Sequence, residues 1–222
     1  MSRPVVVLRP EPGNTATADA VEALGLTAIR LPLFAVRAVD WSPPDPRDFD
    51  ALILTSANAV RLGGAGLDRF KNLPVHAVGA ATAQAAQGAG FSVVAAGDSD
   101  GAALMADAQR AGVGRALLLG GRERKLEAGG AIRAAITVYA SEPRDLAPDA
   151  LAAIEGSVVL VHSPNAARRL DALAREIDRG AVRVAALSAA VAAAVGEGWA
   201  QVEAAPAPND AALLALAHAL AD

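Results

Sequence analysis

Short apolar runs alternate with alanine-rich stretches along the whole chain, and most are bounded by Gly, Pro or Asp. The runs are Val5–Leu8, Thr27–Leu31, Ala51–Leu54, Val75–Val78, Ser92–Ala95, Ala116–Leu119, Ile132–Val138, Val158–Val161 and Val182–Leu187. Strands that alternate with helices predict βαβ units and a parallel sheet. Because a run such as Val158–Val161 is apolar at every position, the sheet should be covered by helices on both faces.

The alternating pattern repeats within the chain, with halves near residues 1–112 and 113–222. Residues 51–61 align with residues 158–168 at one constant offset, which matches Ser56 with Ser163 and Asn58 with Asn165. Alanine-rich helices can align by chance, but the matched serines and asparagines are not alanine. The repeat therefore predicts two similar α/β units.

The two halves also correspond at their first strands, where Val6–Pro10 aligns with Leu117–Gly121. Near the end of each half, Asp100 aligns with Asp210. The stretch after Leu119 is much shorter than its counterpart after Leu8, so we expect only a short helix there.

Two connectors interrupt the repeat. Leu33–Val39 and Ile136–Ser141 each run into a segment containing prolines. Proline blocks helix and favours extended backbone, so both connectors should be extended linkers. One linker in each half implies that the chain crosses between two domains twice.

Composition excludes several functional classes. The net charge is −4 and only 3% of residues are aromatic, which argues against a nucleic-acid-binding surface. The chain has no cysteine and three widely separated histidines, so we expect no disulfide and no metal site. The longest apolar stretch, Val184–Val195, is too short to span a bilayer. No secretory signal or nucleotide-binding fingerprint is present, so we expect a cytoplasmic protein without membrane attachment or cofactor.

Polar residues at strand ends are the candidate binding groups. Ser56 with Asn58, and Ser163 with Asn165, follow strands and open helices, where backbone N–H groups can bind an anion. The same residues can equally be helix N-caps. Thr82 follows another strand, and its hydroxyl either faces this edge or bonds to the helix backbone.

Charged and aromatic candidates complete the set. Arg9 ends the first strand, and Arg122 belongs to a Gly-Gly turn followed by cations, which suits either an anionic ligand or a solvated helix start. His162 is expected to be packed rather than catalytic. Tyr139 is the only tyrosine and lies in the second linker, where it is either amphipathic filler or a proton donor.

Several of these segments, in this order and spacing, resemble the uroporphyrinogen-III synthase family over nearly the whole chain. The segments are Leu8–Pro10, Leu31–Leu33, Leu54–Val60, Ala77–Ala83, Val138–Tyr139, Ser163–Ala166 and Pro208–Ala211. The resemblance implies two α/β domains, each a parallel sheet flanked by helices, joined by a two-stranded linker. The first domain would comprise residues 1–33 plus 147–222 and the inserted domain residues 48–134, with linkers at 34–47 and 135–146.

The same resemblance implies a function. Members of this family convert hydroxymethylbilane to uroporphyrinogen III, with loss of water and inversion of the last pyrrole ring, and need no metal or cofactor. Tyr139 matches the family's linker tyrosine, which assists departure of the hydroxyl in the cleft between the domains. Thr82, Ser56 and Ser163 match its substrate-binding hydroxyls. The substrate would be a linear tetrapyrrole polycarboxylate, and we expect a monomer.

The sequence departs from the family pattern at the second Gly-x-x-Thr motif, which here is Ser188–Val191. Any hydroxyl at that position must come from Ser188. This departure and the short stretch after Leu119 leave two alternatives open. One is a non-catalytic two-domain module that binds an anionic small molecule, and the other is a degenerate synthase-like regulatory domain.

Overall fold

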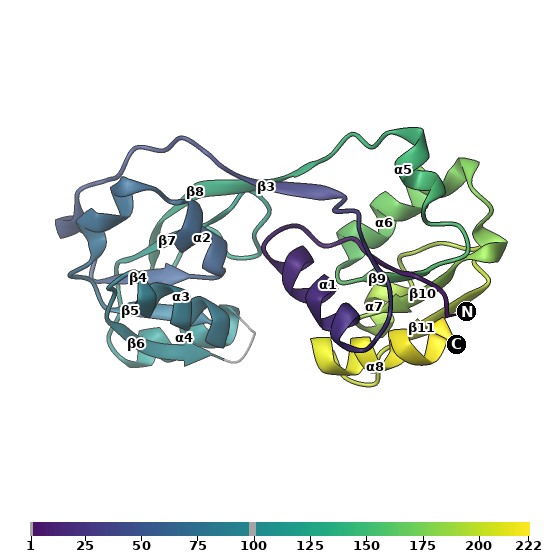
Figure 1. Cartoon of the computed structure of the whole chain (residues 1–222). Coiled ribbons are helices and arrows are strands. Elements are labelled where there is room, and N and C mark those ends of the chain that lie inside the picture. The colour runs from purple at the N-terminus through teal and green to yellow at the C-terminus, as the bar shows by residue number, and fades with distance from the viewer. Residues whose placement is uncertain (1, 98–100) are drawn as a thin grey trace. The chain divides into compact units, whose positions relative to one another are not determined.

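The computed structural model describes residues 2–97 and 101–222, so Asp100 lies outside the described residues. The chain divides into unit 1, residues 1–35 and 143–222, and unit 2, residues 36–142. Each unit contains one sheet, and Figure 1 shows the elements of both.

Unit 1 contains a five-stranded sheet in the order β11-β10-β9-β1-β2, in which neighbouring strands are parallel. Its strands are β1 (Val5–Val7), β2 (Ala28–Arg30), β9 (Val158–Val161), β10 (Arg183–Ala186) and β11 (Gln201–Ala204). Its helices are α1 (Gly13–Ala23), α5 (Pro148–Ala152), α6 (Pro164–Leu173), α7 (Ala189–Ala192) and α8 (Asp210–Ala221), with the 3₁₀ turns η3 (Ala174–Glu176) and η4 (Arg179–Ala181).

Unit 2 contains a six-stranded sheet in the order β3-β8-β7-β4-β5-β6. Its strands are β3 (Phe34–Ala38), β4 (Ala51–Leu54), β5 (Val75–Val78), β6 (Val93–Gly97), β7 (Ala116–Gly121) and β8 (Ile132–Pro143), of which β3 and β8 extend across the boundaries with unit 1. Its helices are α2 (Ala57–Leu62), α3 (Ala80–Gly88) and α4 (Gly101–Arg110), with the 3₁₀ segments η1 (Pro46–Asp48) and η2 (Ala65–Phe70).

Both faces of each sheet are buried at the central strands, as the uninterrupted apolar runs predict, whereas all four residues of the edge strand β11 are exposed. In unit 1, alternate strand residues pack with α6 and α7 on one face and with α1 and α8 on the other (Figure 1). In unit 2, α2 and α3 cover one face, and α4 covers the other. The predicted mixed α/β fold with parallel sheets flanked by helices is confirmed.

The N-terminal strand belongs to the sheet formed by the C-terminal segment. β1 pairs in parallel with β9, in the register Val5 to Val158 and Val7 to Leu160. In unit 2, β7 pairs in the same way with β4, with Ala116 opposite Ala51. Each sheet therefore combines the opening of one sequence repeat with the later strands of the other.

The short helix expected after Leu119 does not form. Residues 122–131, all of which are described, contain turns and one isolated bridge between Gly129 and Ile132. Glycines at both ends of the segment, and its short length, leave too little helix-favouring sequence for a helix comparable to α1. The segment instead folds back as a loop, and this loop brings Arg124 to the end of β7.

Candidate functional site

Each sheet has one pair of neighbouring strands whose chain connections leave in opposite directions. In unit 1, β1 continues through α1 to β2, whereas its neighbour β9 continues through α6 to β10. In unit 2, β4 continues through α2 to β5, whereas its neighbour β7 continues to β8. In parallel α/β sheets, ligands bind at the carboxyl ends of such strand pairs. These two positions are therefore the first places to look for a site.

At this position in unit 2 lies a pocket of about 250 Å³, which we call the glycine pocket. It is lined by Thr55, Val78, Gly101, Gly121, Glu123, Arg124, Lys125, Leu126 and Tyr139. Thr55 follows β4, Gly121 ends β7 and Tyr139 lies on β8, so three adjacent strands supply polar groups or space to one pocket.

The ring of Tyr139 lies directly against the backbone of Gly121. A Cβ atom added to Gly121 would lie 2.8 Å from the ring carbons Cε2 and Cζ and 3.0 Å from the phenol oxygen. Gly121 also pairs with Tyr139 across the strands, after a register irregularity between Gly120 and Gly121. Irregularities of this kind redirect side chains next to functional sites. Any residue larger than glycine at position 121 would force the ring of Tyr139 to move.

Arg124 forms the polar wall of the glycine pocket. Its Nη1 donates to the Gly121 carbonyl oxygen at 3.1 Å and to the Thr137 hydroxyl at 2.7 Å, and its Nη2 contacts Glu127 Oε2 at 3.0 Å. The Arg124 side chain is 15% exposed, whereas Glu127 is 63% exposed. The sequence pattern singles out Arg122 in this stretch and includes Arg124 only among the cations that follow the Gly-Gly turn.

The corresponding position in unit 1 is filled by what we call the arginine cluster: Arg9, Thr17, His162 and Asp210. Arg9 Nη1 lies 2.9 Å from Asp210 Oδ2 and 3.3 Å from the Thr17 hydroxyl. Its guanidinium also lies against Gly13 at the start of α1. The predicted site residue Arg9 is thus already paired within the protein.

His162 is packed into the arginine cluster, as expected from the sequence. Its side chain is 9% exposed, and its Nε2 lies 3.8 Å from Asp210 Oδ1. Among the described residues, neither ring nitrogen has a hydrogen-bond partner. Burial, and to a lesser extent the positive charge of Arg9, lowers the pKa of His162 to about 4, against an opposing effect of Asp210. The imidazole is therefore neutral at pH 7.

The strand-end serines act as helix N-caps. The Ser56 hydroxyl accepts from the Asn58 backbone N–H at 3.2 Å, and the Ser163 hydroxyl accepts from the Ala166 N–H at 3.1 Å. Ser188 precedes α7 but makes no capping hydrogen bond through its side chain. Substrate binding by these residues stays a prediction.

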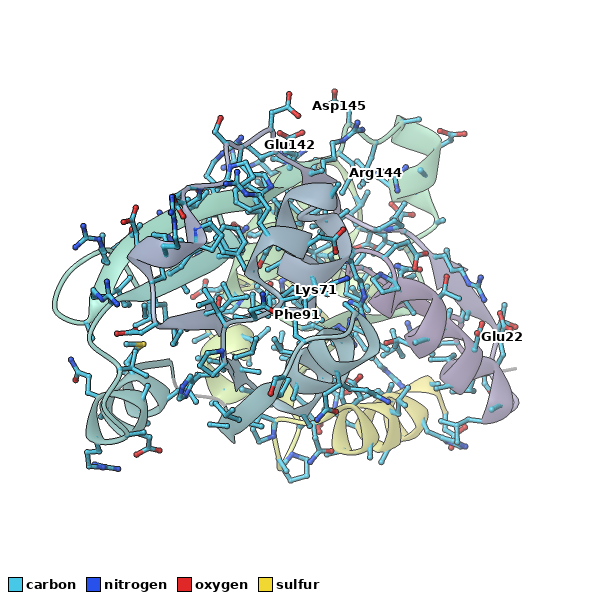
Figure 2. All side chains as sticks on the ribbon, turned by 90° about the vertical axis from the view of Figure 1, so that its left-hand side faces the viewer. Glu22, Lys71, Phe91, Glu142, Arg144 and Asp145 are labelled. Atoms are coloured by element: carbon cyan, nitrogen blue, oxygen red, sulfur yellow. The ribbon has the colours of Figure 1, made fainter. Side chains whose placement is uncertain are left out.

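The remaining predicted residues lie around the sheet edges rather than in the glycine pocket. Asn58 accepts a long 3.4 Å hydrogen bond from Arg61, and Asn165 is half-buried near the start of α6. Thr82 lies on the buried face of α3, and Val191 occupies the buried face of α7. Arg122 is exposed, and its Nη1 lies 3.8 Å from Glu142, which Figure 2 labels.

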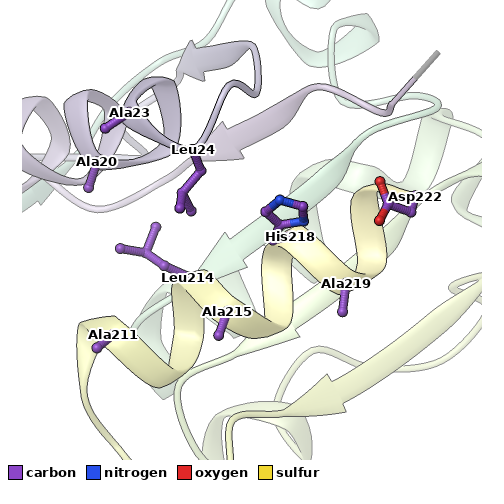
Figure 3. A pocket seen from close by; sticks show the side chains of 9 residues that line it. All are labelled: Ala20, Ala23, Leu24, Ala211, Leu214, Ala215, His218, Ala219 and Asp222. Carbon is purple, nitrogen blue, oxygen red and sulfur yellow. The ribbon is translucent and has the colours of Figure 1, made fainter.

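A wider hollow of about 780 Å³ lies between α1 and α8 of unit 1 (Figure 3). Its lining is mostly alanine and leucine, with His218 and Asp222 as the polar exceptions. It lies away from the strand ends and gathers no set of donors that would hold a carboxylate. The glycine pocket, although smaller, has converging polar groups and is the better candidate.

Within residues 2–97 and 101–222, no helix has both the length and the apolar character needed to cross a membrane. In the same part of the chain, no three His, Cys, Asp or Glu side chains gather into a possible metal site.

Comparison with solved structures finds the same fold at low sequence identity. The structure of uroporphyrinogen-III synthetase from Helicobacter pylori 26695 matches with a TM-score of 0.67 and 19% identity, over 98% of this chain and 99% of that one. A mutant uroporphyrinogen III synthase from the extremely thermophilic bacterium Thermus thermophilus matches with a TM-score of 0.50 and 19% identity, over 98% of each chain. Among curated proteins, no sequence matches.

The family comparison is more specific than the structural one. The family model described as "Uroporphyrinogen-III synthase HemD" matches residues 15–215. This range includes the carboxyl ends of β4 and β7 in unit 2 and almost all of the C-terminal segment of unit 1. Because this match covers most of the chain, and the fold agrees with it, the chain belongs to the uroporphyrinogen-III synthase family.

Proposed function

We propose that this chain is a lyase that cyclises hydroxymethylbilane to uroporphyrinogen III, with loss of water and inversion of the last ring. The observation that best supports this activity is the glycine pocket, where the ring of Tyr139 lies on Gly121 beside the guanidinium of Arg124. A proton donor next to a cation suits a substrate that carries both a leaving hydroxyl and carboxylates.

The reaction needs little chemical assistance from the protein. The pyrrole nitrogen lone pair expels the hydroxyl, the C–O bond breaks, and Tyr139 donates a proton so that water leaves. The substituted carbon of the last ring then attacks the resulting carbocation and forms a spiro intermediate. The bond from this carbon to the bridge that leads to the third ring breaks, and the bridge carbon bonds to the free α-carbon of the same ring instead. That α-carbon loses its proton, which returns to the phenolate, and the neutral product results. Because the substrate supplies most of the driving force, the protein acts mainly by holding one conformation.

The other predicted residues bind carboxylates of the substrate in this proposal. Helix N-termini and strand-end side chains provide N–H groups and hydroxyls for anions. The residues concerned are Ser56, Asn58, Thr82 and Arg122 in unit 2 and Arg9, Ser163, Asn165 and Ser188 in unit 1. Since the net charge is −4, binding depends on such local donors rather than on overall charge.

The direct test is to add freshly prepared hydroxymethylbilane and to separate the type I and type III isomers. The synthase predicts mostly type III product, whereas a protein-free control gives the type I isomer formed by spontaneous closure. Type I product alone, together with saturable binding of the substrate, would instead support the non-catalytic binding module.

Replacement of Tyr139 tests the proton donor. We expect Tyr139→Phe to lower turnover by about 100-fold, the lower end of general-acid contributions, with little change in stability because the ring remains. The measurement is the initial rate of type III formation, with the urea midpoint as a control for folding. Turnover near that of the unmodified protein would remove Tyr139 from the mechanism.

We also propose that the enzyme works as a cytoplasmic monomer, which fits the absence of cysteine from its sequence. Light scattering should give a mass close to 22.3 kDa, and cell fractionation should recover the protein with cytoplasmic markers. A mass corresponding to a dimer would contradict the proposed monomer.

A further inference from the structure

Arg124 is held in place before any ligand arrives. Two of its hydrogen bonds go to groups of unit 2, the Gly121 carbonyl and the Thr137 hydroxyl, at 3.1 and 2.7 Å. A guanidinium that is already oriented loses less side-chain entropy when it binds a carboxylate. Its stem also passes close to Gly120, where an added Cβ would lie 3.6 Å from Arg124 Cδ.

A carboxylate already contacts the outer edge of this guanidinium. Glu127 Oε2 lies 3.0 Å from Arg124 Nη2, three residues along the chain, and Glu127 is mostly exposed. Exposed ion pairs contribute only about 0.2–1 kcal/mol, so a carboxylate from a ligand can replace Glu127 at little cost. Of the other charged residues lining the pocket, Lys125 favours an anion and Glu123 opposes it.

The size of the pocket limits what it can hold. Its volume of about 250 Å³ is below the roughly 300–1,000 Å³ typical of sites that enclose a whole small-molecule ligand. The pocket therefore suits one ring of a tetrapyrrole rather than the whole molecule. Tyr139 and the carbon atoms of Val78 and Leu126 supply apolar surface for such a ring.

From these contacts we infer that the glycine pocket is a single-ring subsite, in which Arg124 binds a carboxylate arm of the pyrrole ring that Tyr139 contacts. This inference rests on the proposed synthase function, which it deepens by assigning a specificity residue. Arg124 selects a carboxylate-bearing ring and fixes its position against the phenol. In this role Arg124 stabilises the bound substrate and the transition state equally.

The subsite can be tested on the whole protein with a monopyrrole that bears one acetate and one propionate arm. NMR titration should show saturable shifts at the backbone amides of Gly120, Gly121 and Tyr139. The dimethyl ester of the same pyrrole has the same ring without charge and should bind much more weakly. Equal binding of acid and ester, or no shifts in this region, would overturn the inference.

Variants of Arg124 separate binding from a structural role. Arg124→Gln should weaken monopyrrole binding about 10- to 100-fold, the usual effect of losing a hydrogen bond to a charged group. Arg124→Lys, which keeps the charge, should recover part of this loss. Thr137→Val removes one hydrogen bond that orients Arg124 and should have a smaller effect than Arg124→Gln.

A matched control is available on α4. Arg110 also pairs with an acidic residue three positions away, Asp107, and is exposed outside the glycine pocket. Arg110→Gln should leave monopyrrole binding unchanged. If Arg124→Gln binds the monopyrrole as well as Arg110→Gln does, Arg124 is not the carboxylate ligand.

Turnover gives a second readout. With hydroxymethylbilane, Arg124→Gln should raise KM by a similar factor while kcat stays within about threefold, because uniform binding changes KM alone. A fall in kcat at unchanged KM would contradict the assigned role. The isomer assay on the unmodified protein keeps the two proposals apart. If that assay gives type I product alone while binding still depends on Arg124, the subsite stands and the synthase proposal fails.

Discussion

The glycine pocket and the arginine cluster occupy equivalent positions in two similar sheets, yet one is open and the other is filled. In the sequence repeat, Gly120 corresponds to Arg9 and Thr55 corresponds to His162. In unit 2 the small residues leave a pocket that Tyr139 and Arg124 line. In unit 1 the larger residues, with Asp210, pair with or pack against each other.

This difference shows how a repeated fold can divide its tasks. Ligands bind at such strand ends because the fold leaves space there, and a single side chain at the end of a central strand decides whether the space remains. Glycine at position 120 leaves the space open, whereas arginine at position 9 fills it and finds an internal partner. The fold alone therefore does not show which unit keeps an open pocket at this position.

The largest effect should come from adding one methyl group beside the ring of Tyr139. Gly121→Ala places a Cβ 2.8 Å from the Tyr139 ring, so the ring must move away. We expect type III formation to fall about 100-fold, as for loss of the phenol itself, because general-acid groups need exact placement. Stability should change little, since the displaced atoms lie at the end of a side chain.

Gly120→Ala is the matched control for this change. Its new Cβ would lie 3.6 Å from Arg124 Cδ and Thr55 Oγ1, which is ordinary van der Waals contact. Turnover should stay close to that of the unmodified protein. Equal losses in both variants would show that the two glycines do not act through the position of Tyr139.

The next effect concerns the filled position and depends on pH. The pKa of His162 is lowered to about 4 in the folded protein, from an ordinary value of 6.5. Between these values the unfolded chain binds a proton that the folded protein does not, so stability falls as the pH is lowered from about 6.5 towards 4. The loss attributable to His162 is at most about 3 kcal/mol.

His162→Thr, which introduces the residue found at the equivalent Thr55, should flatten this dependence. The measurement is the free energy of unfolding in urea at several pH values. Burial also lowers the pKa of His76, but His76 is present in both proteins and cancels in the comparison. An unchanged slope in His162→Thr would show that His162 does not titrate in this range.

A smaller effect should distinguish the capping serines. Ser56→Ala and Ser163→Ala each remove an N-cap hydrogen bond and should lower the free energy of unfolding by about 1 kcal/mol. Ser188→Ala is the control, because the Ser188 side chain makes no capping bond. Urea titration of the three variants measures the difference, and equal losses at all three would contradict it.

The smallest effect should come from the ion pair of the arginine cluster. Arg9 and Asp210 are both partly exposed, and such pairs contribute at most about 1 kcal/mol. A double-mutant cycle with Arg9→Gln and Asp210→Asn should give a coupling of this size that decreases with added salt. A much larger coupling would mean that the filled position is an important source of stability rather than only an occupied space.

Much of the fold is accessible from the sequence. Ala51–Leu54, Val75–Val78 and Val158–Val161 are strands with the predicted limits. Because both faces of each strand are buried, nearly every residue in these runs is apolar, and a stretch of four residues is enough to predict the strand. The packing of the N-terminal strand with the C-terminal segment follows from the family resemblance, since periodicity does not reveal which strands pair.

The candidate site is less accessible because its geometry depends on contacts between distant positions. Tyr139 stands out as the only tyrosine, but its contact with Gly121 depends on the register irregularity between β7 and β8. Arg124 gains its position from Thr137 and from a loop where the sequence predicts a short helix. Hydrophobic patterns do not encode either feature.

The central place of β1 has a consequence for the order in which the chain folds during synthesis. β1 lies between β2 and β9, and the Val158 backbone N–H donates to the Pro4 carbonyl, so the sheet of unit 1 is incomplete until residues near 158 have been made. Two strands alone are marginally stable. Unit 2, residues 36–142, is continuous and can fold first. β1 is therefore synthesised well before β9, and it pairs with β9 only after unit 2 has been made.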